Sequence, residues 1–341
     1  MENHQWWPRD LLSVVSDGAL VSPEATVIAV CKNEMYFLPA FLEHYRRLGA
    51  TRFCILDDCS EDGSFDFLRR QKDVTLLKSP YSYGQNLVPD SGPLAGKEIR
   101  AMLAWRNALA AQFGLGRWTI QVDMDEFLVL PEGLSISGLF SRLDTTDSCA
   151  ALGVMLDLYP QKIEPKRISD EFDPYSDWFY DGVPHLELQG SQSKPRQLYA
   201  GSRARLMRNF GVRYAGLSDQ FRAIRKGNWP PMLNTLYKPV AVKWRDGDWY
   251  KSSHRVSAPL SDEVLLPILH YKFADSLRER AESAVAEGAH YQGSKGYALL
   301  AELLDRAERS GSTLLYRKSR PVSGFEDFVL TGNARVPDFN A

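Results

Sequence analysis

The chain has 341 residues, of which 44% are hydrophobic and 25% are charged. This composition is ordinary for a folded globular protein, and the length suffices for one large or two ordinary domains. The 41 basic and 43 acidic residues nearly balance, so charge gives no reason to expect a nucleic-acid partner. We find no apolar run of about 18 residues and no signal-like start, so we expect neither a spanning helix nor secretion.

Four cysteines, Cys31, Cys54, Cys59 and Cys149, show no spacing typical of a metal site. Cys31, Cys54 and Cys149 lie in or beside apolar runs, which indicates small buried hydrophobic side chains. Such unpaired cysteines are typical of a reducing compartment. We therefore predict a cytoplasmic protein, and we include peripheral contact with the inner face of a membrane in that prediction.

The first half of the chain alternates between strand patterns and helix patterns. Residues 1–24 are predicted to be a lead-in, and the continuous apolar run 27–31 predicts a strand covered on both faces. A helical spacing of apolar residues follows and stops at Gly49. The next predicted elements are a strand at 53–56, a short helix at 65–70, a strand at 74–77, a helix at 97–113 and a half-buried strand ending at Asp123. This alternation predicts an α/β fold with an open, mostly parallel sheet flanked by helices.

Polar clusters follow three of these strands, and ligands of such sheets bind beyond the carboxyl ends of the strands. The clusters are 32–34, Asp57 with Asp58, and Asp123 with Asp125. In extended backbone, Asp123 and Asp125 project from one side and repel each other. A divalent cation often compensates the negative charge of two such carboxylates, and the same cation commonly binds the oxygens of a diphosphate. The alternative interpretation is that these are ordinary polar loops, in which Glu34 and Asp62 only cap the helices that follow.

Three segments resemble loops of glycosyltransferase family 2, which has the Rossmann-like GT-A fold. Residues 30–34, 57–64 and 122–127 read VCKNE, DDCSEDGS and VDMDEF, in the order and spacing of that family. The family often has glycine where this chain has Cys59. The resemblance implies a Mn²⁺ or Mg²⁺ ion held by Asp123 and Asp125. It also implies a nucleoside diphosphate sugar as donor, with a UDP-sugar as the first candidate. The residues implied to bind that nucleotide sugar are Asn33, Glu34, Asp57, Asp58, Asp123 and Lys272.

The second half resembles a subset of the same family that has a His-Tyr-Lys or His-Phe-Lys element. The matching segments are 238–240, 253–254, 270–273 and 292–294, with Tyr297. A neutral imidazole can complete a metal site begun by carboxylates, which makes His270 and His254 candidate ligands. Lys272 could neutralise the leaving diphosphate. Ordinary core histidines are the alternative.

The predicted domains are a nucleotide-sugar-binding half at 25–160, an acceptor-binding half at 161–274, and helices with a tail at 275–341. A strand is predicted at 150–158, and the aromatic stretch 161–199 suits either an acceptor groove or a loop pinned by its own aromatics. The basic segment 201–208 would face phosphate or an acidic glycan, or form a solvated strand. Two amphipathic helices are predicted within 275–308, and an irregular tail after Arg320. The predicted fold is therefore a GT-A sheet with a C-terminal helical extension.

We therefore expect a metal-dependent glycosyltransferase that moves a hexose from the donor to a hydroxyl of a glycan or lipid-linked acceptor, as in polysaccharide biosynthesis. The resemblance implies inversion, which needs a carboxylate to take the acceptor proton. Asp219 and Asp157 are the candidates for that base. A nucleotide-sugar-binding protein without turnover, a glycoside hydrolase with paired carboxylates and a nucleotidyltransferase stay open as alternatives.

Overall fold

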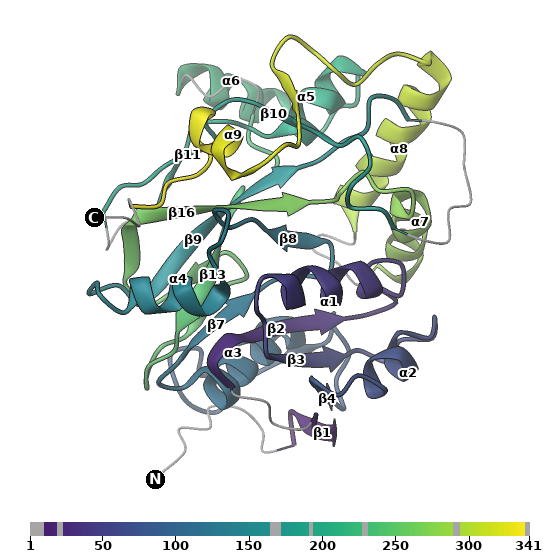
Figure 1. The fold of residues 1–341 in the computed structure, drawn as a ribbon. Coiled ribbons are helices and arrows are strands. Elements are labelled where there is room, and N and C mark those ends of the chain that lie inside the picture. The colour runs from purple at the N-terminus through teal and green to yellow at the C-terminus, as the bar shows by residue number, and fades with distance from the viewer. Residues whose placement is uncertain are drawn as a thin grey trace. The chain divides into compact units, whose positions relative to one another are not determined.

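A computed structural model describes residues 10–18, 23–163, 172–190, 194–226, 231–288 and 294–337. The fold is mixed α/β, with a large, mostly parallel central sheet flanked by helices (Figure 1). The predicted α/β class is thereby confirmed, and the finer assignment to the GT-A fold stays a prediction. None of the helices within these residues combines the length and the apolar character that crossing a bilayer requires.

Within the described residues, nine strands form the sheet in the order β1-β4-β3-β2-β7-β13-β9-β16-β8. Their bounds are β1 Ser13–Ser16, β4 Val74–Lys78, β3 Arg52–Asp57, β2 Thr26–Cys31, β7 Trp118–Gln121, β13 Tyr237–Lys243, β9 Ala150–Asp157, β16 Leu260–His270 and β8 Glu126–Leu128. Strands β4, β3, β2 and β7 are mutually parallel, with Val27 opposite both Phe53 and Ile120. Their carboxyl ends therefore lie along one edge of the sheet.

The helices are α1 Leu38–Arg47, α2 Ser64–Arg69, α3 Ala101–Gly114, α4 Ile136–Leu143, α5 Ser202–Asn209, α6 Leu217–Arg225, α7 Leu277–Glu287, α8 Lys295–Ser310 and α9 Phe325–Leu330, with a 3₁₀ turn at Pro23–Ala25. The short strands pair as β5 Asn86–Leu87 with β6 Ile99–Arg100, β10 Phe179–Asp181 with β17 Ser319–Pro321, β11 Leu186–Glu187 with β12 Arg196–Gln197, and β14 Tyr250–Ser252 with β15 Arg255–Val256. Every helix and strand predicted before Asp123 is present, within a few residues of its predicted bounds.

The chain divides into two compact units. Unit 1 is Met1–Gly153 with Gly190–Gln192 and Lys238–Asp262, and unit 2 is Val154–Gln189 with Ser193–Tyr237 and Glu263–Ala341. These units are discontinuous in sequence, unlike the contiguous segments that we predicted. The functional roles assigned to those segments stay predictions.

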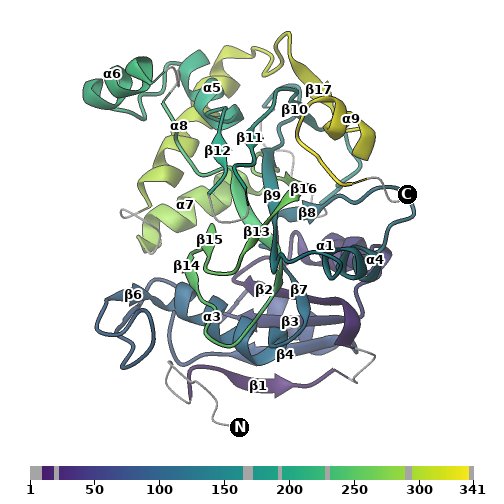
Figure 2. The ribbon, with the colours of Figure 1, turned by 90° about the vertical axis from the view of Figure 1, so that its left-hand side faces the viewer.

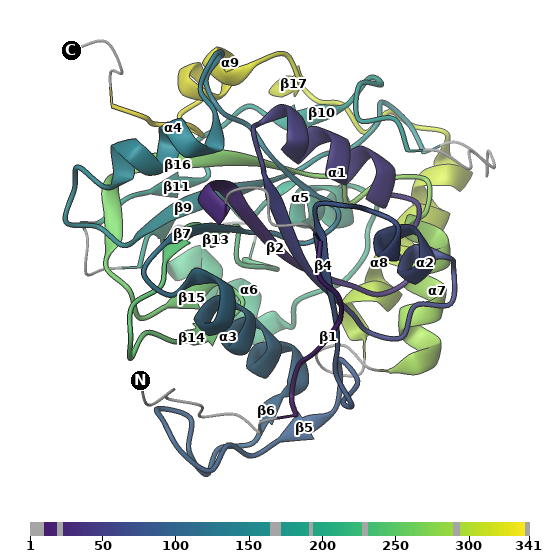
Figure 3. The same cartoon turned by 60° about the horizontal axis from the view of Figure 1, so that its bottom comes forward.

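In unit 1, helices cover both faces of the parallel strands. Figure 3 shows α1 and α3 on opposite sides of β2. Because side chains alternate along a strand, Ile28 of β2 packs in one cluster with Trp105 of α3, while its neighbour Val27 is directed to the opposite face. Both are buried, which explains why this strand reads as a continuous apolar run. Gly49 ends α1 with a positive φ of 88°, a conformation that glycine adopts without strain.

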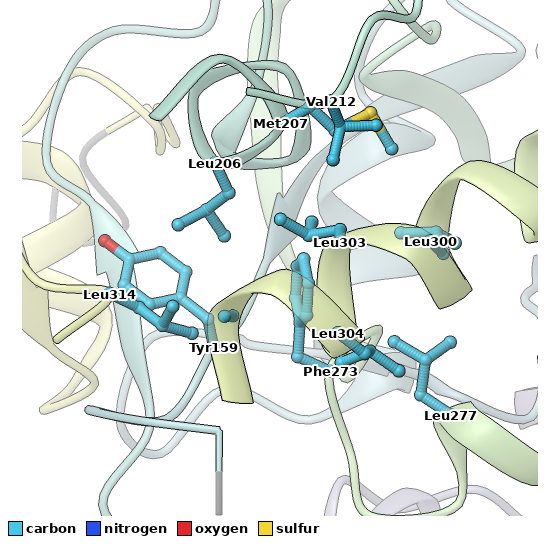
Figure 4. Packing of buried hydrophobic residues seen from close by; sticks show 11 residues of the cluster. Tyr159, Leu206, Met207, Val212, Phe273, Leu277, Leu300, Leu303, Leu304 and Leu314 are labelled. Atoms are coloured by element: carbon cyan, nitrogen blue, oxygen red, sulfur yellow. The ribbon is translucent and has the colours of Figure 1, made fainter. Parts of the chain in front are cut away.

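Unit 2 has its own hydrophobic cluster, which joins α5, α7 and α8. In Figure 4, Leu206 and Met207 of α5 face Leu303 of α8. Helices α7 and α8 contact each other along their length (Figure 2), as the two predicted amphipathic helices require. The predicted C-terminal helical extension is therefore present.

Several sequence-based expectations about secondary structure are wrong. All residues of β7 are buried, so it is not the half-buried strand that alternation predicted. Residues 202–209 form α5 rather than a strand. The tail contains β17 and α9, and the predicted lead-in contributes edge strand β1. Residues 292 and 293 of the predicted motif lie outside the described residues.

Candidate active site

The loops after β2 and β3 are locked together by hydrogen bonds between their polar residues. The backbone N of Asn33 donates to Oγ of Ser60 at 2.9 Å, and Oδ1 of Asn33 accepts from the backbone N of Glu61 at 2.8 Å. The backbone N of Glu34 donates to Oγ of Ser64, 3.1 Å away, at the start of α2. The structure thus brings the first two predicted clusters into one fixed arrangement.

Asp57 and Asp58 are buried at the end of β3, being 1% and 4% exposed. Oδ2 of Asp57 accepts from the backbone N of Ser60, and Oδ2 of Asp58 accepts from the backbone N of Tyr83, each at 3.1 Å. Within the described residues, the buried Oδ1 of Asp57 has no hydrogen-bond partner. A buried acceptor without a donor costs free energy, so a ligand N–H or O–H would be stabilised at this atom.

Cys59 occupies the place where the family pattern has glycine, and its backbone has a positive φ of 54°. The left-handed conformation is one that glycine adopts freely and a residue with a Cβ adopts at a cost. The turn therefore keeps the backbone that a glycine would give, and the exposed Cys59 side chain is the source of strain.

Replacing Cys59 by glycine is expected to raise the free energy of unfolding by about 0.5–1 kcal/mol, because the relief of left-handed strain exceeds the added chain entropy. Equilibrium urea denaturation measures this change. Cys59→Ala is the matched control, since alanine removes the thiol and keeps the strain. A Cys59→Gly protein no more stable than Cys59→Ala would contradict the explanation.

The acidic cluster after β7 is a turn, not the extended backbone that we predicted. The backbone N of Glu126 donates to the carbonyl O of Asp123 at 3.1 Å, and the backbone N of Asp123 donates to Oε2 of Glu126 at 2.8 Å. Lys238 of β13 donates to the same Oε2 at 2.6 Å and to Oδ2 of Asp123 at 3.1 Å. Arg106 of α3 donates to Oδ1 of Asp123. Two protein cations therefore hold this turn.

The charge state of Asp123 follows from these neighbours. Burial alone would raise the pKa of Asp123, but Arg106 and Lys238 hold it well below its ordinary value. The negative charge of Asp125 acts in the opposite direction, so the two carboxylates interact. Asp125 is itself 7% exposed. Asp123 is therefore ionised at neutral pH, with its charge compensated by Arg106 and Lys238, and the second carboxyl group of Asp125 lies near it.

The third predicted cluster belongs to the same edge as the first two. Strand β2 lies between β3 and β7 and is parallel to both. The loops that start after Cys31, Asp57 and Gln121 therefore leave the sheet at one edge within unit 1. His254 also belongs to unit 1, in the turn between β14 and β15, where its backbone N donates to Oγ of Ser252 at 3.2 Å.

Asp157 and His270 come together in unit 2. Oδ1 of Asp157 lies 2.6 Å from Nδ1 of His270, and Nε of Arg203 donates to Oδ2 of Asp157 at 2.6 Å. Burial would raise the pKa of Asp157, but Arg203 and His270 hold it below its ordinary value. This environment favours an orienting role for Asp157, since a carboxylate with both oxygens engaged is a poor proton acceptor. Its assignment as the base stays a prediction.

The remaining candidates in unit 2 occupy different surroundings. Lys272 is buried, with Nζ 5.0 Å from the centre of the Tyr297 ring. Asp219 lies on the exposed helix α6, where Arg222 Nη1 is 3.5 Å from its carboxylate. An exposed pair of this kind is typical of a solvated helix surface, and the base role of Asp219 stays a prediction.

No protein-family model matches the chain. No curated protein matches it either. Within the described residues, no group of three or more His, Cys, Asp or Glu side chains is placed to hold a metal ion. The function therefore has to be argued from the side chains at the sheet edge.

Sequence reasoning missed the roles of Arg106, Lys238 and Arg203. Arg106 is 7% exposed, and in the sequence it occupies one of the positions at which apolar residues recur along the predicted helix 97–113. A charged residue at such a position indicates a buried charge, which needs a partner of opposite charge. Lys238 is 1% exposed and precedes a proline in β13. No alternation of apolar and polar residues around it indicated that its side chain would be buried.

Proposed function

We propose that this protein is a glycosyltransferase that uses a nucleoside diphosphate sugar as donor and a hydroxyl group as acceptor. The observation that supports the proposal best is the set of carboxylates at the ends of the parallel strands β3 and β7. An open α/β sheet binds its ligands at this edge. The resemblance of the three loops to glycosyltransferase family 2 agrees with that location.

In this proposal the first two loops bind the nucleoside. The buried Oδ1 of Asp57 accepts a hydrogen bond from an N–H of the base or from a ribose hydroxyl. Asn33, Glu34 and Asp58 lie in the same two loops, and the hydrogen bonds between the loops fix the first two residues before the donor arrives. A binding site that is ordered in advance binds its ligand more tightly, since less conformational entropy is lost.

In this proposal Asp125, together with Asp123, would hold a Mn²⁺ or Mg²⁺ ion that also binds the diphosphate. Such ions commonly take one or two carboxylates from the protein and further oxygens from phosphates, so a complete protein cage is not needed. When bound, the ion neutralises charge on the departing diphosphate. Arg106 and Lys238 keep Asp123 ionised and fix its orientation. The metal roles of His254 and His270, and the diphosphate role of Lys272, stay predictions.

A thermal-shift screen of UDP-, GDP-, CMP- and dTDP-sugars, with and without Mn²⁺, tests this proposal. At a donor concentration of about 100 times Kd, binding adds about 2.7 kcal/mol and should raise Tm by about 3–6 °C. The increase is expected to require the metal. Incubation of the stabilising donor with candidate acceptors then measures transfer. Binding without sugar release would favour the non-catalytic alternative, and hydrolysis of glycosides in the presence of EDTA would favour the hydrolase.

Asp57→Asn is expected to weaken donor binding by about tenfold or more, because a hydrogen bond to a charged acceptor contributes about 1.5–3 kcal/mol. Titration of the thermal shift with donor measures the change. Asp66→Asn is the matched control, since Asp66 is an exposed residue of the adjacent helix α2. Equal donor affinity in the Asp57 and Asp66 variants would remove the nucleoside role from Asp57.

A further inference from the structure

Helix α6, Leu217–Arg225, carries large apolar side chains on its exposed surface. Leu217, Phe221 and Ile224 are 74%, 66% and 58% exposed. A helix turns by about 100° per residue, so residues separated by three and four positions fall on one side. These three side chains therefore form one stripe, which we call the α6 apolar stripe. Ala223, the residue that α6 buries, lies on a different side of the helix.

Basic residues are concentrated in α6 and the segments next to it in sequence. Between residues 208 and 226 there are five exposed cations and one acid, Asp219, whereas the whole chain has a net charge of −2. The exposed cations are Arg208, Arg213, Arg222, Arg225 and Lys226. Arg222 lies 3.5 Å from Asp219, so the single acid is itself paired with a base. The local charge is therefore strongly positive on a chain that is slightly acidic.

The positions of the cations relative to the stripe match a particular kind of surface. Arg225 follows Phe221 by four residues, so the cation lies directly beside the stripe on the helix surface. Within unit 2, Figure 2 shows α6 at the outer end, beyond α5. Short amphipathic helices with an apolar side bordered by Lys and Arg lie flat in the headgroup region of anionic bilayers.

We propose that α6 docks this protein onto an anionic lipid bilayer. Leu217, Phe221 and Ile224 enter the boundary between headgroups and acyl chains, and the adjacent cations contact the headgroup phosphates. The positive charge selects an anionic surface, and three protruding apolar side chains fit a fluid bilayer, which accepts them without a preformed pocket. This inference does not depend on the proposed function, and it assigns residues to the membrane contact that the sequence suggested only in general terms.

Co-sedimentation of the full chain with vesicles tests the proposal. We expect vesicles of phosphatidylcholine mixed with phosphatidylglycerol to bind the protein about 100-fold more tightly than phosphatidylcholine alone, because Arg222, Arg225 and Lys226 each contribute about fivefold. Added salt should weaken this binding. The triple variant Leu217→Ser, Phe221→Ser, Ile224→Ser is expected to lower the partition coefficient by about 100-fold.

Leu330→Ser is the matched control, because Leu330 is 81% exposed on α9, outside the proposed contact. It should bind vesicles like the natural protein, and all variants should keep the natural far-ultraviolet circular dichroism and Tm. A second variant, Arg222→Gln, Arg225→Gln, Lys226→Gln, should lose the preference for phosphatidylglycerol. The proposal is overturned if the natural protein shows no such preference, or if the triple serine variant binds as tightly.

Discussion

Replacing Lys238 by methionine is expected to lower the free energy of unfolding by about 3–5 kcal/mol, since it leaves a buried carboxylate without its cation. Lys238 and Glu126 are each 1% exposed, and their charged atoms lie 2.6 Å apart. Water cannot replace the lost ammonium group at such a site. Equilibrium urea denaturation measures the loss, and the midpoint should fall without a change in slope.

Two further variants separate this explanation from a simple loss of packing. Lys243→Met lies on the same strand, but Lys243 and its partner Asp144 have side chains 35% and 48% exposed, so we expect a change below about 1 kcal/mol. Adding Glu126→Gln to Lys238→Met should recover a large part of the stability, because the double variant no longer buries the negative charge of Glu126. A double variant as unstable as Lys238→Met alone would mean that the cost does not come from the loss of the Lys238 charge beside Glu126.

The parallel part of the fold was predictable because its strands are buried on both faces. Residues 27–31 and 53–56 read as unbroken apolar runs, and helices with an apolar side separate them along the chain. The position of the polar clusters then follows from topology, since parallel strands end at one edge. For the same reason Asn33, Asp57 and Asp58 could be chosen from the sequence before the contacts between their loops were known.

What the sequence did not reveal depends on partners that are distant along the chain. Lys238 and Glu126 are 112 residues apart, so no local period marks either as half of a buried pair. Residues 201–208 look like a solvated basic segment until Arg205 is placed against Asp181, 24 residues earlier, with which it forms two hydrogen bonds. That buried pair holds Arg205 inside unit 2, so the segment is not a solvated basic strand.

The segment after Arg320 contains a helix pattern that the sequence-based prediction did not use. Phe325 and Phe328 are spaced by three residues and both are buried in the structure, as an amphipathic helix requires. The helix is only six residues long, and so short a pattern differs little from chance. Its stability comes from tertiary packing, which a sequence does not display.

If Asp125 holds the metal ion as proposed, Asp125→Asn is expected to reduce sugar transfer by at least about 100-fold, because the ion that neutralises the diphosphate contributes several kcal/mol to the transition state. The substitution keeps the size of the side chain, so the turn between β7 and β8 should fold normally. Initial rates with the donor found by thermal shift, measured over a range of Mn²⁺ concentrations, give the loss. The variant should also need more Mn²⁺ for half-maximal rate, since it binds the ion more weakly.

Glu132→Gln is the matched control for this experiment, because Glu132 is an exposed acid that follows the same turn within ten residues. It removes one negative charge near β8 and should leave the rate and the Mn²⁺ requirement unchanged. Unaltered tryptophan fluorescence and Tm in both variants would show that a lost rate reflects chemistry and not unfolding. A folded Asp125→Asn protein with the natural rate, or natural activity that persists in EDTA, would rule out a metal role for the acidic turn.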